Sequence, residues 1–260
     1  MLVVVLLPAT AQDTAFVLQK RIPASGTALA VDNLGYLYLL DETSQLKKLN
    51  PAGDSLAVFN DIKRSGRATL LDVSNPLKVL LYYRDFATIV VLDRLLGLRN
   101  TIDLRRQDIV QVSAIGQSYD NKIWLYDEYA NKLKKTDEEG KLLSETADFR
   151  LLVGEAIVPQ QIFEQDRQVY LYDPAKGIFV FDYYGTLKTK IPVTGWQHVK
   201  ASGRYIYGTA GGKLFRYDMT TLLTREWALP PALAGSLSFT FTSSGVYVLK
   251  KEGIEIYTLR

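Results

Sequence analysis

The chain has 260 residues, of which 47% are hydrophobic, so it can bury a substantial core in one large domain or two small ones. Its 31 basic and 28 acidic residues are interspersed, and because phosphate binding requires a concentrated basic face, we expect no nucleic-acid partner. The sequence has no cysteine and one histidine, which excludes disulfides and thiolate metal sites and leaves a Ser-His-Asp triad one possible base. We therefore predict no resident metal or cofactor.

The first eleven residues, 1–11, combine a short apolar run with an Ala-x-Ala pattern at Ala9 and Ala11, which is typical of a signal-peptidase site. The run is about half the roughly 20 apolar residues that a membrane span needs, so we predict no transmembrane segment. We interpret 1–11 as the remainder of a signal peptide and 12–260 as a single domain, located in the periplasm or secreted. A buried first strand is the alternative interpretation of this run.

From residue 16 onward, runs rich in Val, Ile, Leu, Tyr and Phe alternate with Gly, Asp, Asn and Pro turns about every 8 to 12 residues, which is typical of an all-β chain. Similar runs, each followed by a polar turn, occupy residues 36–40, 79–83, 123–126, 169–172, 205–208 and 246–249. Five repeat intervals separate Asp41, the polar residue after the first run, from Lys250, the polar residue after the last run. The repeat is therefore about 42 residues long, which is the length of a four-stranded propeller blade.

A second marker follows the third run of most units, where an Asp or Asn precedes a Gly by three or four residues. The pairs are Asn50 and Gly53, Asp93 and Gly97, Asp137 and Gly140, and Asp182 and Gly185, with Asp218 beginning a degenerate copy. The Asp or Asn side chain can accept backbone N–H groups in the turn, and glycine can take a positive φ. Two markers in one register indicate a true repeat.

The two ends of the chain predict how the ring closes. After the run 253–257 the sequence given has no room for a fourth strand, whereas the strand-like segment 16–22 precedes the first complete unit. Because a propeller closes its ring to avoid exposed strand edges, we predict that this N-terminal strand becomes the outermost strand of the last blade. The predicted fold is an all-β, six-bladed β-propeller with four-stranded antiparallel blades.

Residues 30–41 and 46–53 together resemble the repeat of NHL-like and TolB-like six-bladed propellers, and residues 117–127 with 132–140 repeat the pattern. The resemblance covers most of the chain, although the fifth and sixth units lack the Asp after the second strand. It is a resemblance of fold, carried by turns and core positions. The superfamily includes peptide and protein binders, lactonases and lyases, so the resemblance implies an architecture and leaves the function open.

In such a fold, the loops that enter the innermost strands share one face with the turns between the second and third strands, and ligands usually bind there. The register places these candidate binding residues on that face: Arg67, Arg84, Asp85, Phe86, Glu128, Tyr129, Trp196 and His198. Tyr129 and Trp196 are candidate aromatic anchors, with packing between blades as the alternative for Trp196. A patch around Phe86, Leu95 and Leu96 is a further candidate interface.

Related propeller lactonases imply an enzyme alternative, in which carboxylates in the central channel hold a divalent cation. The candidate carboxylates are Asp32, Asp72, Asp120, Glu164 and Asp166. Three of them fall where the chain must turn between first and second strands, so we interpret them as turn residues and assign no metal ligand. We interpret His198 as a hydrogen-bonded structural residue, with a titrating base in the channel mouth as the alternative.

Together these observations favour a non-catalytic exported scaffold, a monomeric propeller that binds a protein or peptide partner of a bacterial envelope or outer-membrane complex. The absence of a recognisable catalytic motif, the leader-like residues 1–11 and the broad face of a rigid disc support this hypothesis. The alternative is a metal-dependent hydrolase or lyase with its site at the central channel mouth. A sugar or peptidoglycan sensor is a third hypothesis.

Overall fold

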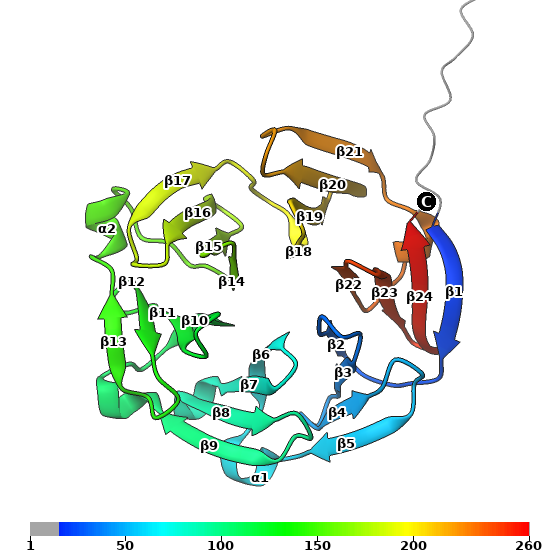
Figure 1. The fold of residues 1–260 in the computed structure, drawn as a ribbon, viewed down its shortest axis with the longest axis horizontal. Helices are drawn as coiled ribbons and strands as arrows, with labels where there is room; N and C mark the ends of the chain where they lie inside the picture. Colours follow the sequence, from blue (N-terminus) through cyan, green and yellow to red (C-terminus); the bar gives the residue numbers. More distant parts are fainter. Residues whose placement is uncertain (1–15, 260) are drawn as a thin grey trace, which may run out of the picture.

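The computed structural model describes residues 16–259, which form six four-stranded antiparallel sheets arranged as blades around a central axis (Figure 1). The blades are counted from the first complete one. Blade 1 contains β2 (Ala28–Val31), β3 (Leu37–Leu40), β4 (Leu46–Leu49) and β5 (Ser55–Phe59), and blade 2 contains β6 (Ala68–Asn75), β7 (Lys78–Tyr83), β8 (Thr88–Asp93) and β9 (Leu98–Asp103). Blade 3 contains β10 (Val112–Gln117), β11 (Ile123–Asp127), β12 (Lys132–Thr136) and β13 (Leu142–Glu145). The predicted six-bladed propeller is confirmed.

Blade 4 contains β14 (Gln161–Gln165), β15 (Gln168–Asp173), β16 (Gly177–Asp182) and β17 (Leu187–Ile191), and blade 5 contains β18 (Gln197–Ser202), β19 (Tyr205–Ala210), β20 (Lys213–Asp218) and β21 (Thr224–Ala228). Blade 6 contains β22 (Ser238–Thr242), β23 (Gly245–Lys250), β24 (Gly253–Leu259) and β1 (Phe16–Ile22). Short helices α1 (Ile62–Ser65) and α2 (Phe149–Leu152) lie in the connections that lead to blades 2 and 4. None of the helices within residues 16–259 is long and apolar enough to cross a membrane.

The core lies between the blades. Buried apolar residues of the described chain form six clusters, and each cluster joins the facing sheets of two neighbouring blades. The middle strands are therefore covered on both sides: every residue of β7 is buried, and so are all residues of β8 except Asp93. This explains why their sequences are almost continuously apolar instead of alternating.

The Asp and Gly turn markers have the structural role that the sequence predicts. The Oδ1 atom of Asp93 accepts hydrogen bonds from the N–H groups of Leu95 (2.7 Å) and Gly97 (2.8 Å), and Asp137 and Asp182 bind their own turns in the same way. Gly140 has φ +87°, and a Cβ atom there would lie 2.5 Å from the side chain of Ile102 at the end of the preceding blade. Glycine is therefore needed both for the turn and for packing between blades.

The N-terminal strand closes the ring as predicted. Strand β1 pairs antiparallel with β24, from Phe16 opposite Leu259 to Ile22 opposite Ile254, with a bulge near Lys20 (Figure 1). Ile22 is buried in the cluster between blades 6 and 1, and Lys20 Nζ donates to the carbonyl oxygen of Ala52 in blade 1 at 2.8 Å. The predicted signal-peptide residues 1–11 lie outside the described residues.

We predict that replacing Ile22 with alanine lowers the free energy of unfolding by about 2–5 kcal/mol, because it leaves a cavity in the cluster that joins the last blade to the first. The matched control is Leu18→Ala on the same strand, where the side chain is 39% exposed and the expected loss is below about 1 kcal/mol. Urea denaturation followed by tryptophan fluorescence measures both values. Equal losses for the two variants would contradict the role assigned to Ile22.

Candidate functional site

One face of the propeller carries the connections that enter the innermost strands, together with the turns between second and third strands; we call it the entry face. The connections are residues 23–27, 60–67, 104–111, 146–160, 192–196 and 229–237, and the turns are residues 41–45, 84–87, 128–131, 174–176, 211–212 and 251–252. These segments share a face because successive turns of an antiparallel blade alternate between its two ends. The connections that lead to blades 2, 3, 4 and 6 are the longest.

Charged residues link the entry-face turns of blades 2 and 3. Arg84 Nη2 lies 3.6 Å from Glu128 Oε1, and Glu128 Oε2 accepts a hydrogen bond from Gln111 Nε2 at 2.7 Å. Arg105 Nη2 donates to the backbone carbonyl of Asp85 at 2.8 Å. These contacts fix the turn after β7 against the turn after β11, so the predicted residues Arg84, Asp85 and Glu128 form one connected group.

The network continues toward blade 4. The backbone N–H of Phe149, at the start of α2, donates to the carbonyl oxygen of Asn131 in the turn after β11. The N–H of Val158 donates to the buried carboxylate of Asp173 at 2.7 Å. Because each loop is tied to a neighbouring turn, the entry face of blades 2 to 4 is a pre-organised surface, which lowers the entropy cost of binding.

Large apolar side chains are exposed on this same sector. The exposed residues are Phe86, Val110, Tyr129, Leu151, Leu152 and Val158. Tyr129 is 70% exposed and Leu151 84% exposed, whereas the entry-face loops of blades 1, 5 and 6 contribute only Leu237 to the exposed large apolar residues of the described chain. Clustered exposed apolar groups beside polar ones are typical of a protein-binding surface.

Two predicted features of this face require correction. Trp196 is buried between blades 4 and 5, where its ring stacks on Phe215 and occupies the space beside Gly208. It therefore packs between blades instead of forming an exposed anchor. The predicted patch of Phe86, Leu95 and Leu96 is also divided, because Phe86 lies on the entry face, Leu95 lies on the opposite face and Leu96 is buried.

The remaining predicted residues lie at the entrance to the innermost strands. Arg67 is exposed immediately before β6, and His198 is the second residue of β18. Val110, Leu151 and Val158 were not predicted from the sequence. An isolated apolar residue in a long connection gives no periodic signal, so the length of residues 104–111 and 146–160 was the one available signal.

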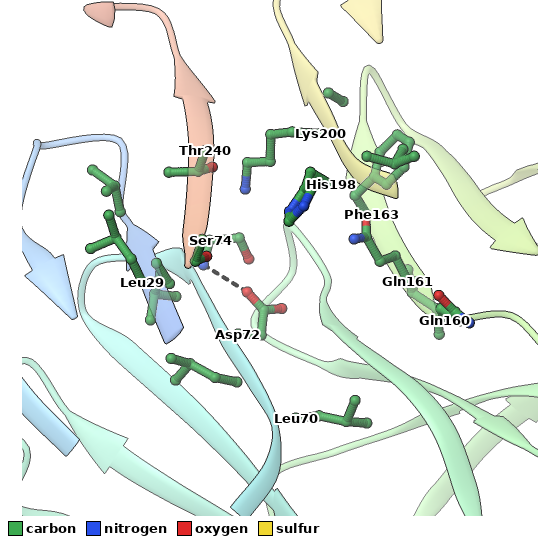
Figure 2. A pocket seen from close by; sticks show the side chains of 18 of the residues that line it. Leu29, Leu70, Asp72, Ser74, Gln160, Gln161, Phe163, His198, Lys200 and Thr240 are labelled. Atoms are coloured by element: carbon green, nitrogen blue, oxygen red, sulfur yellow. Dashed lines mark hydrogen bonds between the residues drawn. The ribbon is translucent and has the colours of Figure 1, made fainter. Parts of the chain in front are cut away.

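The six innermost strands enclose a central cavity of about 320 Å³. Polar side chains from four strands line it, including Ser74, Gln161, His198, Lys200 and Thr240 (Figure 2). The register of β18 against β19 shifts between Gln197 and Lys200, and His198 has a left-handed φ of +53°. Such a bulge can redirect a side chain, and here it contributes to the cavity wall.

The channel carboxylates have structural partners. Asp72 accepts a hydrogen bond from the N–H group of Ser74 at 2.7 Å (Figure 2). It also accepts one from the N–H group of Gln117 at 2.7 Å and so ties β6 to β10 of the next blade. Glu164 Oε2 accepts a hydrogen bond from Trp124 Nε1 at 2.6 Å. Asp32 accepts two backbone N–H groups in its turn. Within residues 16–259, no three His, Asp or Glu side chains converge as a metal site would require.

His198 lies in the channel without a hydrogen-bond partner among the described residues, which differs from the structural role we expected. Its ring centroid is 4.3 Å from that of Phe239. The channel walls partly remove water from the imidazole, and this desolvation lowers the pKa of His198 below its usual value of 6.5. The imidazole is therefore harder to protonate than a free one, and Lys200 lines the same cavity.

The face opposite the entry face carries an ion pair supported by aromatic rings. The Asp120 carboxylate accepts hydrogen bonds from Tyr183 Oη at 2.5 Å and Lys135 Nζ at 3.0 Å, and Lys135 lies 3.7 Å from the centre of the Tyr183 ring. Burial alone would raise the pKa of Asp120, but these hydrogen bonds outweigh it and hold the pKa at about 2. The expected turn residue thus also joins blade 3 to blade 4.

Comparisons with known proteins show the fold. No family model matches the sequence, and no curated protein matches it. A catalytically inactive virginiamycin B lyase from Staphylococcus aureus, determined with quinupristin, aligns with TM-score 0.64 and 15% identity over 94% of this chain and 89% of that chain. The WD40 domain of Pan2 from Neurospora crassa aligns with TM-score 0.63 and 10% identity over 90% of this chain and 78% of that chain. The designed protein Ika8 aligns with TM-score 0.55 and 15% identity over 89% of this chain and 70% of that chain.

At these identities the likeness establishes a β-propeller and nothing finer. The sheet topology makes this chain a six-bladed propeller, so the predicted resemblance is confirmed at the level of the fold. The similar structures include a lyase and a WD40 domain, so the shared fold does not decide between catalysis and binding.

We predict that the His198 imidazole titrates with a midpoint below 6.5, because the channel walls disfavour its charged form. The sequence contains one histidine, so a single set of imidazole signals reports this titration in an NMR experiment. Phe239→Ala, which removes the neighbouring ring, should move the midpoint toward 6.5. A midpoint at or above 6.5 in the unmodified protein would contradict the placement of His198.

A second prediction concerns Asp120. Its pKa is lower in the folded chain than its usual value of 3.8, so the ionised form stabilises the fold above pH 3.8, and this contribution is lost as the pH falls through about 2. Asp120→Asn should therefore lower the free energy of unfolding at neutral pH, and the difference from the unmodified protein should shrink between about pH 4 and pH 2. Denaturant titrations across this range measure the difference, and a constant value would refute the assignment.

Proposed function

We propose that this protein is a non-catalytic exported scaffold that binds a protein partner of a bacterial envelope complex through the entry face of blades 2 to 4. The observation that carries the proposal is the row of exposed apolar side chains, from Phe86 through Tyr129 to Leu151, on loops that are fixed by hydrogen bonds. Aromatic residues on a pre-organised surface are effective anchors because they bury a large area at a small entropy cost.

The charge pattern of this surface supports a protein partner. Arg84 and Glu128 lie beside the apolar residues and partly neutralise each other. A surface with an apolar centre and paired charges of both signs is typical of a protein interface, whereas a nucleic-acid interface would be predominantly basic. The leader-like residues 1–11 support the exported location.

The alternative, a metal-dependent hydrolase or lyase at the channel mouth, has less support. Asp72 and Glu164 are held by hydrogen bonds to neighbouring blades. His198 has neither a carboxylate to orient it nor a serine within hydrogen-bond reach among the described residues, and nucleophilic catalysis by a triad needs both. The channel chemistry therefore favours a wall of polar side chains over a catalytic centre.

The proposal predicts that Phe86→Ser combined with Tyr129→Ala reduces recovery of the partner by about tenfold or more, because truncation of interface anchors commonly costs over 1 kcal/mol each. The measurement is affinity purification of the tagged full chain from the native envelope after cross-linking, with quantitative mass spectrometry. Both side chains are exposed, so the fold should be unchanged.

The matched control is Leu34→Ser combined with Leu77→Ala, which removes two exposed apolar side chains from the opposite face. Recovery of the same partner should be unaffected by this control. If the control reduces recovery and the entry-face variant does not, the binding face has been assigned wrongly. If no stoichiometric partner is recovered by the unmodified chain, the scaffold proposal fails.

A further inference from the structure

Blade 5 contains a small pocket on the face opposite the entry face, with a volume of about 200 Å³. The residues that line it are Arg204, Tyr205, Arg216, Asp218, Thr221, Leu223 and Arg225. Three guanidinium groups and one carboxylate therefore surround the cavity, which leaves a net positive charge. The overall charge of the chain is only +3, so this concentration is a local feature.

Two of these arginines face each other across neighbouring strands. In the pairing of β20 with β21, Arg216 lies directly opposite Arg225. Side chains at directly opposed positions of an antiparallel pair lie on the same face with Cβ atoms about 4.5–5.5 Å apart, and like charges there destabilise the sheet. Neither guanidinium group forms an ion pair with a described acidic residue.

The corresponding strands of blade 3 show the usual arrangement. There Lys134 lies opposite Glu145, with the charged groups 3.8 Å apart, and Lys134 also contacts Asp127 at 2.8 Å. On the other face of blade 5, Lys213 pairs with Glu226 at 2.6 Å. Cations on these outer strands are thus normally neutralised, and the pair Arg216 and Arg225 departs from that pattern.

The pocket is also pre-organised. The guanidinium carbons of Arg216 and Arg204 lie 4.4 Å and 5.1 Å from the centre of the Tyr205 ring, and Arg216 lies 5.2 Å from the centre of the Trp227 ring. These rings restrict both side chains. Asp218 already has partners, because one oxygen accepts two backbone N–H groups and the other pairs with Arg204 at 2.7 Å. Asp218 thus neutralises the charge of Arg204, whereas the charges of Arg216 and Arg225 are not compensated by it.

We propose that this pocket binds the phosphoryl group of a small phosphomonoester. A phosphomonoester carries nearly two negative charges at neutral pH, which matches the two uncompensated guanidinium groups, whereas a carboxylate would neutralise only one. Guanidinium groups donate paired hydrogen bonds that fit phosphate oxygens. The site lies on the face opposite the proposed protein-binding surface and is independent of it.

The test is isothermal titration calorimetry of the full chain with glycerol 3-phosphate and inorganic phosphate at constant ionic strength. The unmodified chain should bind at one site, and Arg216→Gln and Arg225→Gln should each weaken binding by about tenfold or more, since each removes charge-assisted hydrogen bonds. The matched control is Lys188→Gln, which removes an exposed cation from the outermost strand of blade 4 and should leave the affinity unchanged.

A charge-reversal variant tests the pocket through the stability of the fold. Arg225→Glu places opposite charges at the paired positions, so in phosphate-free buffer its Tm should exceed that of the unmodified chain by about 1–3 °C. Phosphate should raise the Tm of the unmodified chain and leave that of Arg225→Glu unchanged. Absence of saturable binding to either probe, or an equal response in Lys188→Gln and the arginine variants, would overturn the proposal.

Discussion

The pairing of β1 with β24 is the contact on which the rest of this structure depends. Each hydrophobic cluster of the described chain lies between two blades, so no blade has a core of its own. A ring of this kind is stable only when every junction is filled, and the junction between blades 6 and 1 includes Ile22 from the N-terminal strand. Closure by β1 completes the last of the six junctions between neighbouring blades, so that every blade is packed on both sides.

A closed ring also determines where function can reside. The blades differ most in the lengths of their connections, and the long connections form a hydrogen-bonded entry face on blades 2 to 4. Among the described residues that line the central cavity, the one carboxylate is that of Asp72, which already bridges neighbouring blades through Gln117. The charged pocket of blade 5 is different, because its unpaired cations contribute nothing to closure. Both proposed binding sites therefore lie on the outer faces of the ring.

Local patterns made the fold predictable, whereas contacts between blades were harder to foresee. Turn residues such as Asp93 act within a few positions of themselves, so the repeat was readable. Trp196 was predicted to be exposed, but it is buried because Gly208 leaves space for its ring. Gly208 occupies the repeat position that holds Tyr126 in unit three and Tyr172 in unit four, and this difference was the signal in the sequence for the burial of Trp196. The exposure of Val110 and Leu151 depends on loop conformation, which no periodic pattern encodes.

Hydrogen exchange measured by mass spectrometry can show whether the ring depends on its N-terminal strand. If β1 closes the ring, the amides that bond β1 to β24 should exchange slowly and with the same free energy of opening as those of the buried strand β7, because all belong to one cooperative unit. Fast exchange of β1, with β7 still protected, would show that the ring does not depend on the N-terminal strand and would contradict the account.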